Sequence, residues 1–329
     1  MDFELKYMQR CIQLAKCGAM GAPPNPMVGA VIVHNDTIIG EGYHRRCGGP
    51  HAEVNAIRSV RDESLLKEST IYVSLEPCSH YGKTPPCADL IIEKQIPRVV
   101  VGCMDPFAKV NGQGIRKLRD AGIEVVVGVL EKECLELNSR FITFHRQHRP
   151  WVTLKWAQSE DGFVDVDRQM DEQPAKFSSP FTQTLVHRMR AMRQAIMVGT
   201  KTVLMDNPTL TTRLWDGPDP LRVTIDRKGV LPDFVHLKDS KVPTVIYNNG
   251  DLKQILDDLY KRGIQSLMVE GGPQLLQHFI DAGLWDEARV EIAPITLGKG
   301  VPAPEIKNAL LAKKAILDNR KILNYRPEM

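Results

Sequence analysis

The sequence predicts an α/β protein with two domains, and three observations carry this prediction. Apolar, strand-like runs alternate with helical patterns along the 329-residue chain, which is typical of sheets covered by helices on both faces. All seven cysteines lie at or before Cys134, whereas the four tryptophans lie at or after Trp151. The length corresponds to about two domains. We therefore predict one domain over residues 1–145 and a second over residues 146–329.

The first half opens with a helical pattern, in which Met8, Cys11, Ile12 and Ala15 recur at helical spacing before Gly18. Short apolar runs predict strands, and a turn of the hairpin type separates the first two of them at Asn35-Asp36. The predicted strands are 28–34, 37–42, 70–75, 98–102 and 124–129. The predicted helices are 2–17, 51–60, 85–95, 112–121 and 131–142.

The second half begins after a polar, basic segment, residues 140–150, which we interpret as the domain boundary. It continues the strand and helix alternation. The predicted strands are 151–157, 195–199, 221–226, 244–248, 266–270 and 288–294. The predicted helices are 181–193, 251–262 and 273–282. The polar stretch 159–180 is predicted to be a mobile loop.

Composition excludes several classes of protein. The chain is 43% apolar and 25% charged, as soluble globular proteins are. Its clean apolar runs, such as 28–33, fall far short of the roughly 18 residues of a membrane helix, and its start lacks the pattern of a secretory signal. Residues 1–145 hold equal numbers of basic and acidic residues, so the net charge of +3 lies in the second half and neither half has a basic nucleic-acid surface. We expect a soluble, cytoplasmic protein.

Four residues of the first half form a zinc-binding pattern. His51, Cys78 and Cys87 supply one imidazole and two thiolates, and a catalytic zinc site keeps its fourth position for water. Cys87 falls in the first turn of a predicted helix, where a thiolate is favoured. Glu53 can reach the metal-bound water without ligating zinc and can pass its proton to a leaving amine. H-x-E followed by P-C…C is typical of zinc nucleobase deaminases, although eight residues separate the two cysteines here instead of two.

Alternatives remain for the thiols. An odd number of cysteines in a chain without a signal argues against a disulfide framework. Cys47, four residues before His51, is a competing ligand in a glycine-rich loop. The other cysteines fall in helical or strand patterns and are predicted to belong to the core, as single cysteines commonly do. They are Cys11, Cys17, Cys103 and Cys134.

The residues around these ligands resemble one family. The segment EPCSHYGKTPPC (76–87), with PNPMVG (24–29) and GYH (42–44), resembles the deaminase domain of the bifunctional riboflavin-biosynthesis deaminase/reductases. The resemblance implies a cytidine-deaminase-like three-layer αβα domain that deaminates diaminohydroxyphosphoribosylaminopyrimidine. It implies that His51, Cys78 and Cys87 bind one Zn²⁺ and that Glu53 is catalytic. The residues implied to line the substrate pocket are Asn25, His44, His80, Lys83 and Thr84.

One loop departs from this family. Asp105-Pro106 matches, but the family commonly continues with Asn-Pro, whereas this chain has Phe107-Ala108. A contact of this loop with substrate is therefore left open.

A second pattern follows the strand at 266–270. Gly271-Gly272-Pro273 precedes a predicted helix, so a ligand could approach the backbone and the helix N-terminus could hold a phosphate, although such a turn also serves for packing. Gly112-Gln113-Gly114 lacks the third glycine of a dinucleotide fingerprint and is predicted to be a turn.

The second half resembles the reductase domain of the same family through LK (154–155), SEDG (159–162), AIMVG (195–199), DNPTLTTR (206–213) and EGG (270–272). The resemblance implies a dihydrofolate-reductase-like α/β domain that uses NADPH to reduce the ribosyl group of 5-amino-6-(5-phosphoribosylamino)uracil to ribityl. The implied NADPH contacts are Ser179, Thr202, Asp206, Gly271 and Gly272. The implied substrate contacts are Arg190, Leu210, Arg213 and Glu270, of which the arginines suit a phosphate.

Two departures fall in this half. Lys176 stands where the family usually has an aromatic residue, and the segment 165–175 is longer and more acidic than usual. The preference for NADPH over NADH rests on the resemblance, and no proton donor is assigned. The family also implies a homo-oligomer, a dimer.

The favoured hypothesis is a bifunctional riboflavin-biosynthesis enzyme that acts on a small phosphoribosylated pyrimidine and binds neither nucleic acid nor membrane. One alternative keeps the deaminase and makes the second domain a degenerate ligand-binding one. A nucleic-acid-editing zinc deaminase would need a basic groove with interleaved aromatic residues. A zinc-stabilised binding protein would not explain Glu53 beside the ligands.

Overall fold

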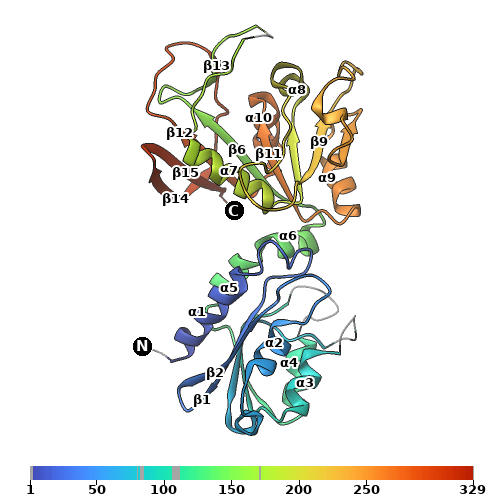
Figure 1. Cartoon of the computed structure of the whole chain (residues 1–329), viewed down its shortest axis with the longest axis vertical. Coiled ribbons are helices and arrows are strands. Elements are labelled where there is room, and N and C mark those ends of the chain that lie inside the picture. The colour runs from blue at the N-terminus through green and yellow to red at the C-terminus, as the bar shows by residue number, and fades with distance from the viewer. Residues whose placement is uncertain (1–2, 80, 82–84, 106–111, 170–171, 329) are drawn as a thin grey trace. The chain divides into compact units, whose positions relative to one another are not determined.

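The structure is a computed structural model that describes residues 3–79, 81, 85–105, 112–169 and 172–328. The chain divides into two compact units, Met1–His148 (unit 1) and Arg149–Met329 (unit 2), and each combines helices with a β-sheet (Figure 1). The predicted α/β class is thus confirmed. Within the described residues, no helix has the length and apolar character that a membrane crossing requires.

Unit 1 is built on a five-stranded sheet with the order β2-β1-β3-β4-β5. β1 is antiparallel to both of its neighbours, whereas β3, β4 and β5 are parallel. The strands are β1 (Gly29–His34), β2 (Thr37–Tyr43), β3 (Thr70–Leu75), β4 (Arg98–Cys103) and β5 (Glu124–Val127). The helices are α1 (Phe3–Lys16), α2 (Ala52–Ser59), η1 (Glu63–Glu68), α3 (Cys87–Glu93), α4 (Gln113–Asp120), α5 (Glu131–Leu137) and α6 (Ser139–Gln147).

Alternation along β1 sends side chains into two separate cores of unit 1. Ala30 and Ile32 pack in the core beneath α2, α3 and α4, whereas Val31 and Val33 pack with α1 and α5 on the opposite face (Figure 1). This is the three-layer αβα arrangement that the sequence predicts.

Glycines in β2 bring α2 close to the sheet. A Cβ atom at Gly42 would lie 2.3 Å from the backbone nitrogen of Ala56, a separation that no side chain tolerates. The backbone of α2 therefore packs directly against β2. This contact fixes the distance between the sheet and the start of α2, where His51 and Glu53 lie.

Unit 2 is built on an eight-stranded sheet with the order β10-β9-β8-β11-β6-β12-β15-β14, and a two-stranded sheet joins β13 to β7. The strands are β6 (Trp151–Gln158), β7 (Phe163–Asp165), β8 (Ala195–Val198), β9 (Leu221–Ile225), β10 (Thr244–Tyr247), β11 (Ser266–Gly271), β12 (Glu287–Ile292), β13 (Val301–Pro302), β14 (Ala309–Leu317) and β15 (Arg320–Pro327). The helices are α7 (Pro180–Ala191), α8 (Thr200–Asp206), η2 (His236–Lys238), α9 (Leu252–Lys261) and α10 (Pro273–Asp281).

The two faces of β6 differ in polarity. Leu154 and Trp156 belong to a large apolar core that includes side chains of α9 and α10. Thr153 and Lys155 point to the other face, since successive side chains of a strand alternate. Arg193, just after α7, donates to the Thr153 hydroxyl at 3.4 Å. One face of β6 therefore packs apolar side chains, and its other face carries Thr153 and Lys155.

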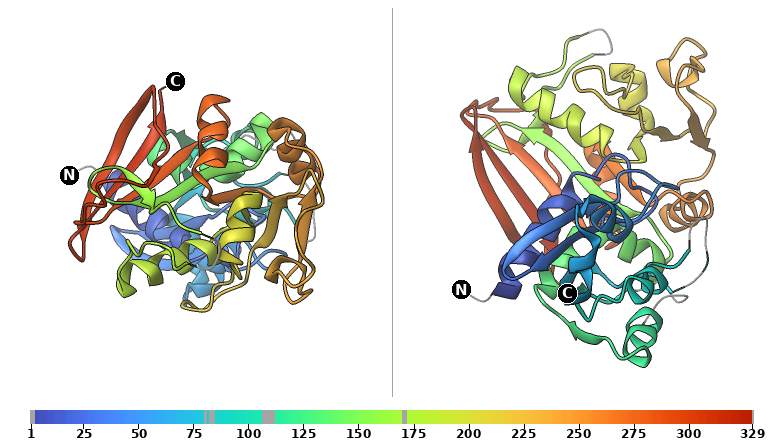
Figure 2. Two further views of the ribbon diagram at one scale, coloured as in Figure 1. Left: turned by 90° about the horizontal axis from the view of Figure 1, so that it is seen from above. Right: turned by 60° about the horizontal axis from the view of Figure 1, so that its bottom comes forward.

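Several elements differ from the sequence prediction. The C-terminal hairpin β14–β15, coloured red in Figure 2, forms one edge of the unit 2 sheet and was not predicted. The short α8 was also missed, and the stretch 159–180 contains β7. The helix predicted over 131–142 is two helices, because Asn138 leaves the helical conformation and its amide bonds both backbone groups of Met27, at 2.8 and 2.9 Å.

Candidate functional sites

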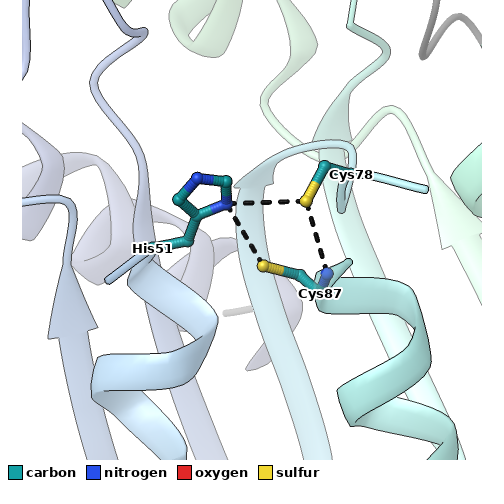
Figure 3. A group of neighbouring side chains, drawn as sticks. All are labelled: His51, Cys78 and Cys87. Atoms are coloured by element: carbon teal, nitrogen blue, oxygen red, sulfur yellow. Dashed lines mark hydrogen bonds between the residues drawn. The ribbon is translucent and has the colours of Figure 1, made fainter. Parts of the chain in front are cut away.

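Three predicted zinc ligands lie together in unit 1 (Figure 3). Nδ1 of His51 lies 3.5 Å from Sγ of Cys78 and 3.3 Å from Sγ of Cys87. Tetrahedral zinc, with Zn–S of about 2.3 Å and Zn–N of about 2.0 Å, separates a sulfur from a nitrogen by about 3.6 Å. The three atoms therefore fit one zinc ion, and among the described residues this is the group that could hold a metal.

Each ligand is placed by the end of an element. His51 is the N-cap residue of α2, Cys78 follows β3 by three residues, and Cys87 begins α3. The backbone N–H of Cys87 donates to Sγ of Cys78 at 3.3 Å. Hydrogen bonds from Cys87 and His51 lower the pKa of the Cys78 thiol to about 4, against the effect of burial. Cys78 is thus favoured as the thiolate that a zinc ligand must be. The hydrogen bond with Cys78, together with burial, instead raises the pKa of the Cys87 thiol, so its position in the first turn of α3 does not by itself favour the thiolate.

Glu53 lies within the first turn of α2 and is 3% exposed. Burial raises the pKa of its carboxyl group to about 7, and the neighbouring His51 opposes that rise. A carboxyl group that titrates near neutral pH can both take and release a proton during a reaction. Its position beside the cluster suits a proton shuttle.

His44 and Asn25 form a rigid pair next to the cluster. Nδ1 of His44 lies 3.0 Å from the carbonyl oxygen of Pro50 and must donate to it, so Nε2 accepts from the Asn25 amide at 3.1 Å. The ring packs edge-on against His51, with centroids 5.3 Å apart, and burial lowers the pKa of His44, which favours the neutral ring. Sγ of Cys47 donates to Asn25 and is no member of the metal-binding group.

Glu76 has a role that the sequence did not reveal. Its carboxylate accepts hydrogen bonds from four backbone N–H groups at and before the start of α4, those of Asp105, Gly112, Gly114 and Ile115. Gly114 also packs so closely that a Cβ atom there would lie 2.0 Å from the carbonyl oxygen of Pro77. α4 therefore clamps the two residues that precede Cys78. The signal was an acidic residue directly before the Pro-Cys pair.

Six of the residues singled out in the sequence lie outside the described residues. Three are predicted substrate contacts, His80, Lys83 and Thr84, and three belong to the loop that departs from the family pattern, Pro106, Phe107 and Ala108.

Unit 2 contains a cavity of about 660 Å³. Five predicted site residues line it: Thr202, Asp206, Glu270, Gly271 and Gly272. The cavity opens where β6 and β11 end and where α8 and α10 begin, the edge of a parallel sheet at which ligands commonly bind.

The glycine turn leaves this part of the cavity free of side chains. Gly272 has φ of +48°, and a Cβ atom there would lie 3.2 Å from Oγ1 of Thr202. A Cβ atom at Gly271 would lie 3.6 Å from the same hydroxyl. Pro273 occupies the first position of α10, so the turn presents a helix N-terminus to the cavity, an environment that favours phosphate.

Arg190 is joined to Glu270, which lines the cavity, but Arg190 itself does not line it. Nε and Nη2 of Arg190 donate to the two carboxylate oxygens at 2.8 and 2.6 Å, and Nη1 donates to the carbonyl oxygen of Thr211 at 3.0 Å. Burial alone would raise the pKa of Glu270, but the charge of Arg190 outweighs it and the pKa is lowered. The arginine expected to bind a substrate phosphate is thus held by the carboxylate expected to bind the same substrate.

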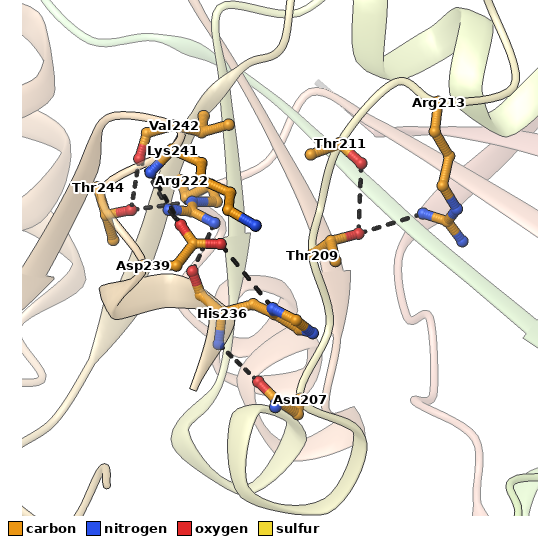
Figure 4. Close-up of polar contacts among 10 residues, drawn as sticks. All are labelled: Asn207, Thr209, Thr211, Arg213, Arg222, His236, Asp239, Lys241, Val242 and Thr244. Atoms are coloured by element: carbon orange, nitrogen blue, oxygen red, sulfur yellow. Dashed lines mark hydrogen bonds and ion pairs between the residues drawn. The ribbon is translucent and has the colours of Figure 1, made fainter. Parts of the chain in front are cut away.

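The segment with Leu210 and Arg213 is firmly anchored (Figure 4). Leu210 is buried and has φ of +55°, whereas Arg213 is exposed and donates to the hydroxyl of Thr209 at 3.3 Å. Asn207 accepts from the backbone of His236 at 2.7 Å. Arg213 is therefore accessible to an anion, but neither it nor Leu210 lines the cavity.

Ser179 lies at the start of α7. Its hydroxyl accepts from the backbone N–H of Thr182 at 3.2 Å, and Thr182 bonds back to Ser179 in a capping box. Ser179 is buried and does not line the cavity. Lys176 is exposed, and the aromatic ring of this segment that does line the cavity is Phe177.

Three cationic side chains line the cavity without having been assigned a role from the sequence, namely Lys155, Arg168 and Lys201. Lys155 on β6 sits in an apolar strand, which is an unusual place for a lysine, and burial lowers the pKa of its amine against the opposing charges of Glu270 and Glu291. Arg168 donates to Asp165 at 2.6 Å and also to Asp206, and no sequence pattern marked it.

Family models cover both units. Residues 1–103 match the model described as "Cytidine and deoxycytidylate deaminase zinc-binding region", and residues 150–319 match the "RibD C-terminal domain". These matches confirm the predicted order of a cytidine-deaminase-like domain followed by a reductase domain.

Whole proteins match over nearly the full length. The riboflavin biosynthesis protein RibD of Aquifex aeolicus is 36% identical over all of this chain and 97% of its own length. That of Bacillus amyloliquefaciens is 39% identical over 91% of this chain and 86% of its own.

A crystal structure gives the same result. The diaminohydroxyphosphoribosylaminopyrimidine deaminase/5-amino-6-(5-phosphoribosylamino)uracil reductase from Thermotoga maritima superposes with a TM-score of 0.90 and 37% identity, over 99% of each chain. The chain therefore belongs to the RibD family of bifunctional deaminase/reductases in riboflavin biosynthesis.

Proposed function

We propose that this enzyme carries out two successive steps on one phosphoribosylated pyrimidine. Unit 1 hydrolytically deaminates diaminohydroxyphosphoribosylaminopyrimidine, and unit 2 reduces the ribosyl group of 5-amino-6-(5-phosphoribosylamino)uracil to ribityl with NADPH. The name of the Thermotoga maritima enzyme supplies the substrates, and the residues of the two sites supply the chemistry. We further propose that each chain holds one zinc ion, and the homodimer and the cytoplasmic location stay predictions.

In unit 1, His51, Cys78 and Cys87 would hold zinc, since their ligand atoms lie together. When bound, zinc lowers the pKa of a water molecule and supplies a nucleophile at neutral pH. Glu53 takes the proton of the attacking water at its carboxylate and passes it to the departing amine, which leaves as ammonia. Asn25 orients the substrate from its place between His44 and Cys47.

In unit 2, the cavity holds the dinucleotide. When bound, NADPH supplies the hydride. Gly271 and Gly272 would let its phosphates approach the N-terminus of α10, and Thr202 and Asp206 would also contact it. Lys155 is the proton donor at its Nζ, because it lines the cavity and its amine has a lowered pKa. Arg213 binds the substrate phosphate.

The observation that carries the deaminase proposal is the fit of three ligand atoms to one zinc beside the buried Glu53. The test is a Glu53→Gln variant, assayed for zinc content and for ammonia release. Zinc should stay near one per chain while deamination falls by about 10³-fold or more, since the proton shuttle is lost. Cys78→Ser should lose zinc as well as activity.

Cys47→Ser is the matched control, because Cys47 is an exposed thiol near the site that does not belong to the cluster. It should keep both zinc and activity. Deamination by Glu53→Gln at the parent rate would overturn the assignment of the base, and zinc loss in Cys47→Ser would overturn the ligand set.

The reductase is tested separately with deaminated substrate and NADPH, monitored by loss of nicotinamide absorbance. The proposal expects NADPH oxidation with one ribityl product per NADPH. Binding of NADPH without turnover would instead support the degenerate second domain, and turnover with NADH at the same kcat/KM would contradict the preference for NADPH.

A further inference from the structure

Lys155 is one member of a row of charged side chains on the α7 face of the unit 2 sheet. In the parallel pairing of β6 with β12, Lys155 lies opposite Arg289, and Ala157 lies opposite Glu291. Paired and alternate positions share a face, so Lys155, Arg289 and Glu291 all point to one side. The intervening residues, Trp156 on β6 and Val290 on β12, are paired with each other and belong to the apolar core on the other side.

Glu291 is held in place by α7. Its side chain is 0% exposed, and Oε1 accepts a hydrogen bond from the hydroxyl of Thr182 at 2.7 Å. Thr182 is itself fixed in the capping box with Ser179. A buried carboxylate is costly unless charges or donors compensate it, so this one calls for compensating charges nearby.

The compensation is incomplete within β12 itself. Oε2 of Glu291 lies 3.7 Å from Nη1 of Arg289, and neither atom has a hydrogen-bond partner among the described residues. The carboxylate and the guanidinium thus interact through their charges without a hydrogen bond. Their charges are therefore only partly neutralised and also act on Lys155 in the neighbouring strand β6.

Four charged groups surround Lys155 from three elements. Glu270 faces it from β11, Arg289 and Glu291 from β12, and Arg190 from α7. Arg190 is committed to Glu270 by its bidentate pair. Arg289 and Glu291 share no such hydrogen bonds, so their charges are less neutralised than those of Arg190 and Glu270.

We propose that Glu291 is a positioning residue for Lys155. The negative charge of Glu291 favours the protonated form of the Lys155 amine in the cavity, and the positive charge of Arg289 opposes this influence. The influence of Glu291 on Lys155 follows from the sheet register and the bond to Thr182. Only the use of that proton in the reduction rests on the proposed function.

The electrostatic surroundings of the lysine agree with this arrangement. Burial lowers the pKa of Lys155, Glu270 and Glu291 raise it, and Arg190 and Arg289 lower it further. Neutralising Glu291 should then make the amine lose its proton at lower pH, and neutralising Arg289 should make it lose its proton at higher pH. Opposite shifts from two neighbouring residues are difficult to obtain from a general loss of packing.

The test measures the reactivity of Lys155 in the cofactor-free protein. Acetic anhydride acetylates only the neutral amine, so the extent of labelling across pH, read by peptide mass spectrometry, gives the midpoint for Lys155. Labelling of Lys201, which also lines the cavity, serves as the internal reference for the amount of active reagent that reaches the cavity. Glu291→Gln should move the Lys155 midpoint down, and Arg289→Met should move it up, each by about one pH unit.

Arg289→Lys is the matched control, because it keeps the positive charge and should leave the midpoint near that of the parent. Unchanged midpoints in both test variants, or shifts in the same direction, would overturn the proposal. If Glu291→Gln does not fold, as judged by circular dichroism, the contrast between Arg289→Met and Arg289→Lys decides the matter.

The pH profile of the reductase separates the two proposals. If Lys155 donates the proton, the alkaline limb of kcat/KM should move with the labelling midpoint in each variant. A labelling shift without any movement of that limb would support the role of Glu291 and overturn the assignment of Lys155 as proton donor.

Discussion

Arg190 and Glu270 form a bidentate ion pair that joins α7 to the end of β11 at the wall of the cavity. The two side chains are 12% and 8% exposed, so the pair is largely removed from water. Removing one partner of such a pair leaves a buried charge uncompensated, which costs far more than the pair contributes.

The first prediction concerns this pair. Arg190→Met should destabilise unit 2 by about 3–5 kcal/mol, because Glu270 stays buried and charged. The double variant Arg190→Met/Glu270→Gln should recover part of that loss. Urea unfolding monitored by tryptophan fluorescence measures it for unit 2 alone, since all four tryptophans lie there. Strictly additive effects of the two substitutions would show that the residues are not coupled.

The second prediction concerns the clamp on the zinc loop. Gly114→Ala should weaken zinc binding by about 10- to 100-fold, the usual range for groups that orient metal ligands, because its Cβ atom would displace Pro77 and with it Cys78. Competition with a chelator measures the affinity. Gln113→Ala, an exposed change in the same turn, is the control and should bind zinc like the parent protein.

The third prediction concerns the cavity. Trp156 lines it, so titration with NADPH should quench indole emission saturably and give sensitised nicotinamide emission. Asp206→Asn should weaken NADPH binding, and Arg213→Ala should not, because Arg213 lies off the cavity lining. Removal of zinc should leave the signal nearly unchanged. The absence of saturable quenching in folded protein, after correction for absorption, would contradict the assignment of the cavity.

The fourth prediction concerns pH. Burial, with the charges of Arg190 and Arg213, lowers the pKa of His187 from 6.5 to about 4. Between these values the unfolded chain binds a proton that the folded chain does not, so the stability of unit 2 should fall as pH drops from about 6.5 to 4 and be unaffected by this group above that range.

Urea midpoints across pH in the parent and in His187→Asn measure this effect. The asparagine variant should show a smaller decline in that window, since it has nothing to protonate there. Parallel curves for the two proteins would indicate that His187 titrates alike in the folded and unfolded chains.

The sequence predicted the elements whose residues carry a strong periodic signal. Continuous apolar runs such as those of β4 and β11 lie in sheet centres, where burial on both faces demands them. β14 has an exposed, mixed pattern because it is an edge strand, so its residues do not alternate with a core. α8 is only two turns long and was absorbed into a loop.

The residues of the candidate sites also divide into those whose role the sequence predicted and those whose role it did not. The zinc ligands could be predicted because few residue types bind zinc and their order is constrained. Glu76, Lys155 and Arg168 could not be assigned roles, because each has at least one essential neighbour that is distant in sequence. Glu76 bonds backbone groups 29 to 39 residues away, and Arg168 meets Asp206 only after the chain has passed through α7 and β8.

The clamp of Asn138 on Met27 bears on the order in which the enzyme matures during synthesis. The zinc ligands have all left the ribosome once Cys87 has emerged, but the segment that carries Asn25 is tied down by a residue made much later. The segment that carries Asn25 can therefore be fixed only after all three zinc ligands have been synthesised. The enzyme acquires a complete first site only when the end of unit 1 has been translated, close to the point where synthesis of the reductase begins.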